Sequence, residues 1–456
     1  MIRRRDFLKR GASFAALPVI SSVAGCAAPV TSPQSYINGV VAQDRVSPVF
    51  HWTDVMLQAI RNQAVTPPPA TRVFAMAHVA GFNAVNAIEG KYVPTLNTGP
   101  APVGADPAAA YGAAVATALN DALRASFAPD LSRYLSDLPD HGGKSEGVAW
   151  GRSVGHALAA SRYQDGSELS RSEEYLGRYP RRGDNLKWSP TGPFYRAGSP
   201  GPRFGTFARG LLPGWGAVRP WQMKSAGQFL VVDFPEEHTR EFARQLEKIR
   251  VLGGSDSPIR TPDQRQIAFF WEDGPRGVTP PGHWQIIAMD TLQRQHMSLN
   301  DQAHAFAMLS SSQADAAITT WHSKYVHDVV RPETYIRQRA TGANYNPGWN
   351  TLIPTPGFPA YTSGHSCFSA VSARMICNII GRDRIHFSSE SPDLVNWPRE
   401  LTGVRRSWNS LWAAAEEGGA SREFGGIHWE ADNTQGLHAG KKLADFTFRK
   451  LNRKHG

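Results

Sequence analysis

Between residues 321 and 428 the chain carries three clusters: Trp321-His-Ser-Lys324 running to Arg331-Pro332, then Phe358-Pro-Ala-Tyr-Thr-Ser-Gly-His365, then Ser421-Arg-Glu-Phe-Gly-Gly-Ile-His428. Lys324, Arg331 and Arg422 supply three cations, His365 and His428 two imidazoles, Ser363 a hydroxyl and Gly364 a backbone amide. Cations and N–H donors in this combination favour a bound oxyanion. The clusters therefore predict a cage for a tetrahedral or trigonal-bipyramidal oxyanion such as phosphate or vanadate.

The spacing within the clusters suggests how the backbone presents these groups. Lys324 and Arg331 are seven residues apart, which is two helical turns, so both side chains can leave one face of a helix. Pro332 disfavours helical geometry at Arg331 and predicts that this helix ends there. An apolar run follows the second cluster, so Thr362 or Ser363 is expected to cap a helix whose N-terminal N–H groups face the anion.

Glycine and histidine complete the expected cage. Gly364 allows the backbone to approach an anion closely, and His365 follows it, placed for proton transfer. Two glycines before His428 predict a tight loop that returns this histidine to Arg422.

The pattern Lys-x6-Arg-Pro, Ser-Gly-His and Ser-Arg-x5-His resembles the vanadium-dependent haloperoxidase and type 2 phosphatidic acid phosphatase superfamily. The segment from Phe269 to Trp284 resembles one that precedes the active site in the bacterial haloperoxidase-like branch. The resemblance implies an all-α, two-lobed fold of helical bundles similar to that of vanadium chloroperoxidases. Thr362 is a departure, because many members have proline there; we expect it to be tolerated, since Thr can cap a helix.

The resemblance also implies roles for individual residues, with vanadate as the cofactor and phosphate able to occupy the same site. The groups implied to bind the equatorial oxygens of vanadate are Lys324, Arg331, Ser363, the Gly364 amide and Arg422. His428 would be the axial nitrogen ligand of the metal, and His365 the acid–base group beside the apical oxygen. Lys324 would also act in catalysis by polarising the activated oxygen. Trp321 and Phe358 match a chloroperoxidase-type halide pocket, although an ordinary role as core aromatics explains them equally well.

Three functions are compatible with these residues. The resemblance favours a vanadate-dependent haloperoxidase that oxidises halide with hydrogen peroxide to hypohalous acid or halogenated organics, with a small organic molecule as the final acceptor. An exported acid phosphatase could use the same cage, with His428 forming a phosphohistidine and His365 protonating the leaving group. An exported lipoprotein with a vestigial pocket is the third. Candidates for carboxylates that support the cage are Asp328 and Glu423, which are near it in sequence.

Residues 1–26 are typical of an export segment. Arg4-Arg5-Asp-Phe-Leu-Lys9 resembles a twin-arginine motif, and Val23-Ala-Gly-Cys26 after an apolar stretch resembles a lipoprotein cleavage box. We therefore expect export by the twin-arginine route, with the protein periplasmic, secreted, or anchored to a membrane by a lipid on Cys26. The formal charge of +10 can steer anions inward, whereas no long basic run or binding module indicates nucleic acid.

The rest of the chain is predicted to form two helical regions. Residues 38–230 should be a helical region that ends in a strap rich in Pro, Gly and aromatic residues, and residues 231–456 a bundle that carries the site. The strap, residues 163–223, is expected to join the two halves, with a lid over the anion site as the second possibility. Helices are expected at 49–163, 235–251, 261–271, 298–330, from 363 onward, and at 431–451, with an insertion at 383–419.

Four other residues, two histidines and two cysteines, could act as ligands or form crosslinks. His78 lies in an apolar helix and is expected to be a core histidine. His283 lies near a helix start, and we expect it to have a structural role. A role in supporting the site is the alternative. Cys367 and Cys377 would lie about 15 Å apart on one helix, which is too far for a disulfide.

Overall fold

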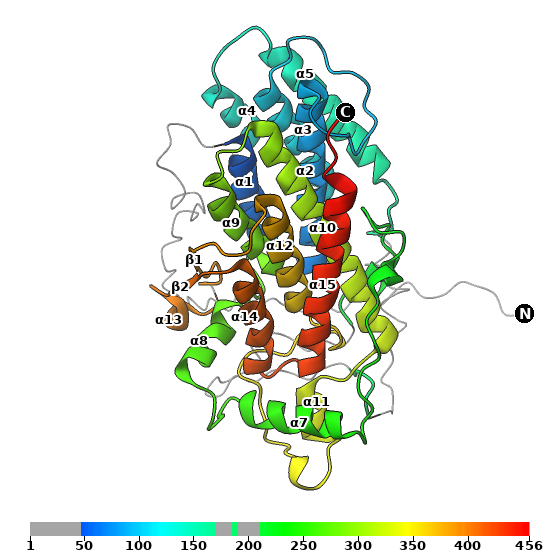
Figure 1. Cartoon of the computed structure of the whole chain (residues 1–456), viewed down its shortest axis with the longest axis vertical. Helices are drawn as coiled ribbons and strands as arrows, with labels where there is room; N and C mark the ends of the chain where they lie inside the picture. Colours follow the sequence, from blue (N-terminus) through cyan, green and yellow to red (C-terminus); the bar gives the residue numbers. More distant parts are fainter. Residues whose placement is uncertain (1–46, 169–184, 190–209, 395, 456) are drawn as a thin grey trace, which may run out of the picture. The chain divides into compact units, whose positions relative to one another are not determined.

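The computed structural model describes residues 47–168, 185–189, 210–394 and 396–455, which all lie in one compact unit of packed helices (Figure 1). The export-type segment 1–26 and most of the strap lie outside these residues. The predicted division of the chain at residues 230 and 231 stays a prediction. None of the helices within the described ranges has the length and apolar character needed to cross a bilayer.

The N-terminal half of the unit is built from helices that pack closely because small residues line them. They are α1 (Pro48–Asn62), α2 (Pro67–Glu89), α3 (Pro107–Leu123), α4 (Ala128–Asp137) and α5 (Lys144–Ser161). Four of the five have proline within the first two positions, where its missing N–H has no intrahelical partner to lose. Gly147, Gly151 and Gly155 recur every fourth residue along α5 and face α3. A Cβ on Gly151 would lie 2.2 Å from the carbonyl oxygen of Ala110, so the two helices can approach this closely only because the glycine has no side chain.

The C-terminal half carries helices of more varied length and one small sheet. Its helices are α7 (Arg240–Leu252), α8 (Pro262–Phe270), α9 (Thr279–Gln293), α10 (Leu299–His327), α11 (Pro332–Gln338), α12 (Gly364–Ile380), α13 (Pro398–Leu401), α14 (Leu411–Phe424) and α15 (Glu430–Leu451). Short 3₁₀ turns occur at η2 (Pro213–Ala217), η3 (Ala226–Phe229) and η4 (Gly342–Asn344). The sheet pairs β1 (Phe387–Glu390) with β2 (Arg405–Trp408) antiparallel, with Phe387 opposite Trp408. The all-α fold class is confirmed, because this two-stranded sheet is the only one in the described residues.

Helix α10 lies at the centre of the unit, with α2 on one side and α12 on another, and α12 lies alongside α15 (Figure 1). The contact between α12 and α15 again depends on glycine. A Cβ on Gly440 would lie 2.5 Å from the carbonyl oxygen of Cys367, and one on Gly436 would lie 2.8 Å from that of Ser363. This close approach brings the first turn of α15 against the first turn of α12.

The end of α10 differs from the prediction. The helix ends at His327, and Asp328 closes it in a left-handed conformation (φ 56°, ψ 43°), which aspartate tolerates better than most residues. Val330 then runs extended, and its N–H donates to the carbonyl of Leu186 in the strap at 2.8 Å. Arg331 consequently precedes α11 as its N-cap residue instead of leaving α10. The prediction that one helix presents both Lys324 and Arg331 is therefore wrong.

The described end of the strap is anchored on α10. Asp315 is fully buried and accepts the backbone N–H groups of Trp221, Gln222 and Met223 at 2.7, 2.7 and 2.9 Å. Further upstream, the carbonyl of Leu211 accepts from the indole of Trp321 at 3.1 Å. Residues 169–184 and 190–209 of the strap lie outside the described residues, so its second possible role, as a lid over the site, stays a prediction.

Candidate active site

Lys324 is fully buried in the last turn of α10 and holds the chain that enters α12. Its ammonium donates to the carbonyls of Pro359, Ala360 and Thr362 at 3.1, 3.0 and 2.5 Å. All three protons of the ammonium are therefore engaged. Burial, and then the nearby Arg331, lower the pKa of Lys324 well below its usual value. In this arrangement Lys324 gives its charge to the cage and fixes the 359–362 backbone. To contact an anion directly, its ammonium would have to give up one of these three hydrogen bonds to carbonyls.

Arg331 and His428 meet directly. Arg331 Nη1 donates to His428 Nε2 at 3.0 Å and to the carbonyl of Ile427 at 2.8 Å, while its Nε donates to the carbonyl of Phe358 at 2.8 Å. Burial lowers the pKa of Arg331 to about 9. Burial, and then the neighbouring Arg331, hold the pKa of His428 well below its usual value. His428 is therefore a neutral imidazole at ordinary pH.

Asp432 fixes the other side of that imidazole. Its Oδ2 accepts from His428 Nδ1 at 2.7 Å and from the N–H of Trp429 at 2.9 Å. With Nδ1 carrying the proton, Nε2 keeps a lone pair that faces Arg331. Burial raises the pKa of Asp432 to about 7. Sequence reasoning missed this residue, although its place four residues after His428 was a usable signal.

The first turn of α12 supplies backbone donors. Ser363 is its N-cap, with φ −65° and ψ 124°, and its Oγ accepts the N–H of Ser366 at 3.2 Å. Ser363 thus takes the capping role, as one of the two residues predicted for it. The N–H groups of Gly364 and His365 start the helix and have no partner within it. A Cβ on Gly364 would meet Trp321 and Phe368 only at ordinary contact distances, so protein packing alone does not require glycine there.

Arg422 and His365 are both held by carbonyls just beyond the end of α8. Arg422 Nη1 donates to the carbonyl of Trp271 at 2.8 Å, and His365 Nε2 contacts that of Glu272 at 3.0 Å. Because a carbonyl only accepts, the proton of His365 sits on Nε2 and Nδ1 keeps a lone pair. Burial, and then Arg422, lower the pKa of His365 well below its usual value. Burial lowers the pKa of Arg422 itself to about 10.

Trp321 and Phe358 form an aromatic wall beside the cations. Their ring centroids lie 5.2 Å apart, and the Phe358 ring lies 4.9 Å from both the Lys324 ammonium and the Arg331 guanidinium. Trp321 is buried and Phe358 is partly exposed. The two predicted pocket aromatics therefore do lie together next to the cage.

The charges of the cage are unbalanced. Lys324, Arg331 and Arg422 are all buried, and within the described residues none of them forms a salt bridge. Arg331 Nη2 and Arg422 Nε are also buried donors with no hydrogen-bond partner in the described part of the chain. Buried unpaired donors and uncompensated charge are costly, so an anion that accepts from both guanidinium groups would relieve both costs. The residues present therefore fit an oxyanion such as vanadate or phosphate.

Of the two carboxylates suggested by sequence proximity, Glu423 forms its printed contacts outside the cage. Glu423 accepts from Lys248 at 2.7 Å and from Asn433 at 2.8 Å, so it supports the packing of α14 on α15. Asp328 is buried at the end of α10, where its N–H donates to the carbonyl of Lys324 at 2.9 Å. The carboxylate that touches the cage is Asp432, in the first turn of α15.

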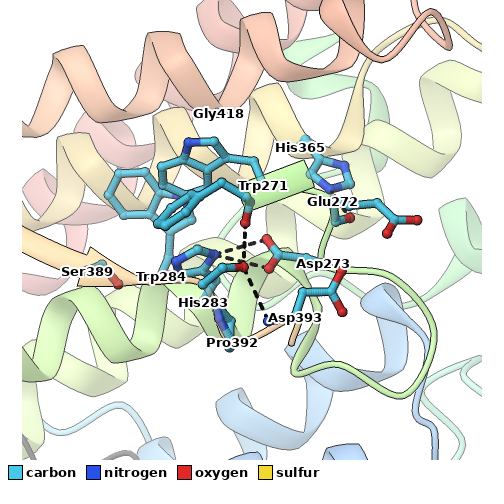
Figure 2. A network of polar contacts seen from close by, with 12 residues as sticks. Trp271, Glu272, Asp273, His283, Trp284, His365, Ser389, Pro392, Asp393 and Gly418 are labelled. Atoms are coloured by element: carbon cyan, nitrogen blue, oxygen red, sulfur yellow. Dashed lines mark hydrogen bonds and ion pairs between the residues drawn. The ribbon is translucent and has the colours of Figure 1, made fainter. Parts of the chain in front are cut away.

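The remaining candidates have structural positions. His78 is fully buried in α2 and contacts the hydroxyl of Tyr111 at 2.9 Å, which confirms a core role. His283, in the first turns of α9, contacts the carboxylate of Asp273 at 3.1 Å (Figure 2). Cys367 and Cys377 are free thiols, as predicted.

The cage residues lie in a segment that is similar to a known protein family. Residues 304–456 match the family model described as VCPO second helical-bundle domain. Residues 304–456 include every one of the cage residues named above. The superfamily resemblance seen in the sequence is thereby confirmed.

The known proteins that this chain is similar to agree in fold. Vanadium chloroperoxidase from Curvularia inaequalis is 24% identical over 249 residues, which cover 43% of this chain and 41% of that protein, less than half of its length. The crystal structure of the first bacterial vanadium-dependent iodoperoxidase matches with a TM-score of 0.76 at 24% identity, over 91% of this chain and 99% of that one. The apo-type bacterial vanadium-dependent chloroperoxidase matches with a TM-score of 0.68 at 16% identity, over 85% and 95%. The chain therefore has the helical fold of vanadium haloperoxidases.

Proposed function

We propose that this protein is a vanadate-dependent haloperoxidase, which oxidises halide with hydrogen peroxide to hypohalous acid or halogenated organic products. The observation that carries the proposal is the imidazole of His428. It is held by Asp432 on Nδ1 and presents a lone pair on Nε2 inside a buried group of unpaired cations.

His428 has the properties of a metal ligand. Its Nδ1–H donates to Asp432, and a carboxylate in that place fixes the tautomer and raises the basicity of the other nitrogen. In the proposed enzyme, Nε2 would hold vanadate. Arg331, which contacts Nε2 at 3.0 Å, would then donate to the bound anion.

The rest of the cage would hold the oxygens of the anion. Arg331 Nη2 and Arg422 Nε supply the free guanidinium donors, and the first N–H groups of α12 together with the Ser363 hydroxyl supply the others. Lys324 lowers the energy of the anion through its charge. Bound vanadate would act as a Lewis acid that activates hydrogen peroxide toward halide.

His365 moves the proton. Its Nε2–H is committed to the carbonyl of Glu272, so Nδ1 is the atom that takes a proton from peroxide and returns it later. Because its pKa is lowered, His365 is neutral at the start of the cycle, and its Nδ1 lone pair can accept a proton.

Trp321 and Phe358 are proposed to border the halide position beside Lys324. A ring edge carries partial positive charge and tolerates a weakly hydrated anion. The names of the relatives include both chloroperoxidases and an iodoperoxidase, so we assign no single halide.

A phosphatase remains the second candidate, because the same donors accept phosphate and Asp432 would equally activate His428 as a nucleophile. One experiment separates the two. Purified protein is titrated with vanadate by calorimetry and then assayed in parallel for bromination of an activated β-diketone and for hydrolysis of a phosphate ester. We expect tight vanadate binding and vanadate-dependent bromination. Ester hydrolysis without halogenation at any pH would assign the site to a phosphatase, and failure to bind either anion would leave a vestigial pocket.

We also propose export by the twin-arginine route, with lipid attachment at Cys26. Incorporation of a labelled fatty acid into the wild-type protein, but not into Cys26→Ser, would support the anchor. Equal labelling of both proteins would exclude Cys26 as the lipid site.

A further inference from the structure

The turn that follows α8 orients two residues of the cage through its backbone. Three consecutive carbonyls accept hydrogen bonds from three different elements. The pairs are Phe270 with Ser391 Oγ at 2.7 Å, Trp271 with Arg422 Nη1 at 2.8 Å, and Glu272 with His365 Nε2 at 3.0 Å. A shift of this turn would therefore move the Arg422 guanidinium and change the tautomer of His365 together.

A short segment of the insertion holds this turn in place. Figure 2 shows Asp393 next to Asp273 and below Trp271 and Glu272. Asp393 Oδ2 accepts the N–H of Gly274 at 3.0 Å, and Asn396 donates to the carbonyl of Pro275 at 3.0 Å. The indole of Trp397 donates to the carboxylate of Glu272. Four residues thus contact the last residue of α8 and the turn after it. The pairs are Ser391 with residue 270, Trp397 with 272, Asp393 with 274 and Asn396 with 275.

The backbone of the turn needs this support. Asp273, Arg276 and Thr279 all have positive φ, at 47°, 64° and 69°. A left-handed conformation is unfavourable for residues with a side chain, and most of all for a β-branched one such as Thr279. Such strain persists only where the surroundings hold it.

Asp393 is itself held by its own neighbours. Asp393 is fully buried, its N–H donates to Ser391 Oγ at 3.2 Å, and its Oδ1 accepts from Asn396 at 2.5 Å. Burial, and then the neighbouring carboxylates of Glu272 and Asp273, raise the pKa of Asp393 well above its usual value. From the opposite side, His283 contacts Asp273 at 3.1 Å and stacks on Trp271 with ring centroids 4.6 Å apart.

We propose that Ser391, Asp393, Asn396 and Trp397 form a clamp that positions His365 and Arg422, with Asp393 as its central positioning residue. The clamp acts through the carbonyls of Trp271 and Glu272 and touches neither the anion nor the halide. Its importance for catalysis rests on the function proposed above, but its effect on the geometry of His365 does not. Residues of the insertion that appear remote from the site in sequence would then control it.

The test compares four variants. Asp393→Ala removes the acceptor for the Gly274 N–H, whereas Asp393→Asn keeps one amide oxygen for it. Ser391→Ala is a milder change that keeps the test valid if Asp393→Ala fails to fold. Asp383→Ala is the matched control, because Asp383 lies in the same insertion but caps α14, accepting the N–H of Trp412 at 2.9 Å.

Two measurements are made at neutral pH without turnover. The tautomer of His365 is read from the nitrogen chemical shifts of the protein labelled with ¹⁵N-histidine, with His365→Gln used to assign the signal. Vanadate affinity is measured by calorimetry, with inorganic phosphate as a second probe. Neither measurement depends on halogenation, so failure of the proposed function is distinguishable from failure of the clamp.

Wild type should show a single Nε2–H tautomer. In Asp393→Ala we expect a mixture of tautomers and an anion affinity weaker by roughly tenfold, as is usual when support for a binding residue is lost. Ser391→Ala should change both in the same direction but less. Asp393→Asn and Asp383→Ala should behave as wild type. A folded Asp393→Ala protein with the wild-type tautomer and affinity would overturn the proposal, as would an Asp383→Ala protein that changes as much as Asp393→Ala.

Discussion

His428 donates its Nδ1–H to Asp432, four residues further along the chain, at 2.7 Å, and both side chains are buried. The hydrogen bond spans the start of α15, so the helix that carries the carboxylate also fixes the orientation of the imidazole. The tautomer of His428 therefore depends on a single residue, and this dependence can be tested.

Asp432→Asn should weaken vanadate binding by roughly 10–100-fold, because the amide supports the Nδ1–H tautomer less well and lowers the basicity of Nε2. The amide oxygen can still accept the N–H of Trp429, so the start of α15 is kept. Affinity is measured by calorimetry. Glu430→Gln is the control, since Glu430 lies next to α15's start but pairs with Arg244 at 2.9 Å on the surface. Unchanged affinity in Asp432→Asn would contradict the proposed ligand role of His428.

His428→Ala should abolish vanadate binding, whereas His365→Ala should leave most of it and slow turnover by about 10²–10⁴-fold, the usual contribution of a general acid–base group. The reason is that His428 is the proposed ligand, while His365 only exchanges protons. The measurement pairs a vanadate titration with the bromination rate at saturating vanadate. Equal loss of binding in both variants would show that the two histidines do not have separate roles.

Gly151→Ala should destabilise the fold by about 1–3 kcal/mol, because a Cβ there would overlap the carbonyl of Ala110 and force α3 and α5 apart. Gly142→Ala is the matched control, since nothing lies within 4 Å of its Cβ position. Urea unfolding of the two variants and wild type gives the comparison. Similar free energies of unfolding for both variants would show that the glycine face of α5 is not needed for its packing.

His78 should make stability depend on pH. Burial lowers the pKa of His78 to about 3, so between the unfolded value of about 6.5 and pH 3 the unfolded chain binds a proton that the folded chain refuses. Stability from this group therefore falls as pH decreases through that window, by roughly 2 kcal/mol between pH 7 and pH 5. His78→Gln lacks this titrating group, so its free energy of unfolding should fall by correspondingly less between pH 7 and pH 5.

The measurement for His78 is the free energy of unfolding of wild type and His78→Gln at pH 7 and pH 5. His238→Gln, at an exposed position, is the matched control. Parallel pH profiles for wild type and His78→Gln would show that the buried imidazole takes up its proton without opposing the fold.

Local rules explain why so much of the cage could be predicted. Ser363 was expected at a helix start because a small hydroxyl residue precedes an apolar run, and it is the N-cap of α12. The cations and imidazoles of the three clusters meet because their types and spacings belong to one family pattern. The end of α10 was mispredicted because the pairing of Val330 with Leu186, more than a hundred residues away, competes with helix continuation.

The sequence by itself determined the helical fold class and named most candidates for the cage, because helix periodicity, capping signals and motifs are properties of short segments. Only the tertiary structure decided what holds those side chains. Lys324, Arg422 and His365 are all held by backbone carbonyls, at Thr362, Trp271 and Glu272 among others. Every residue has a carbonyl, so no side-chain pattern marks the ones that will be near a given donor. Their positions follow from how the helices pack.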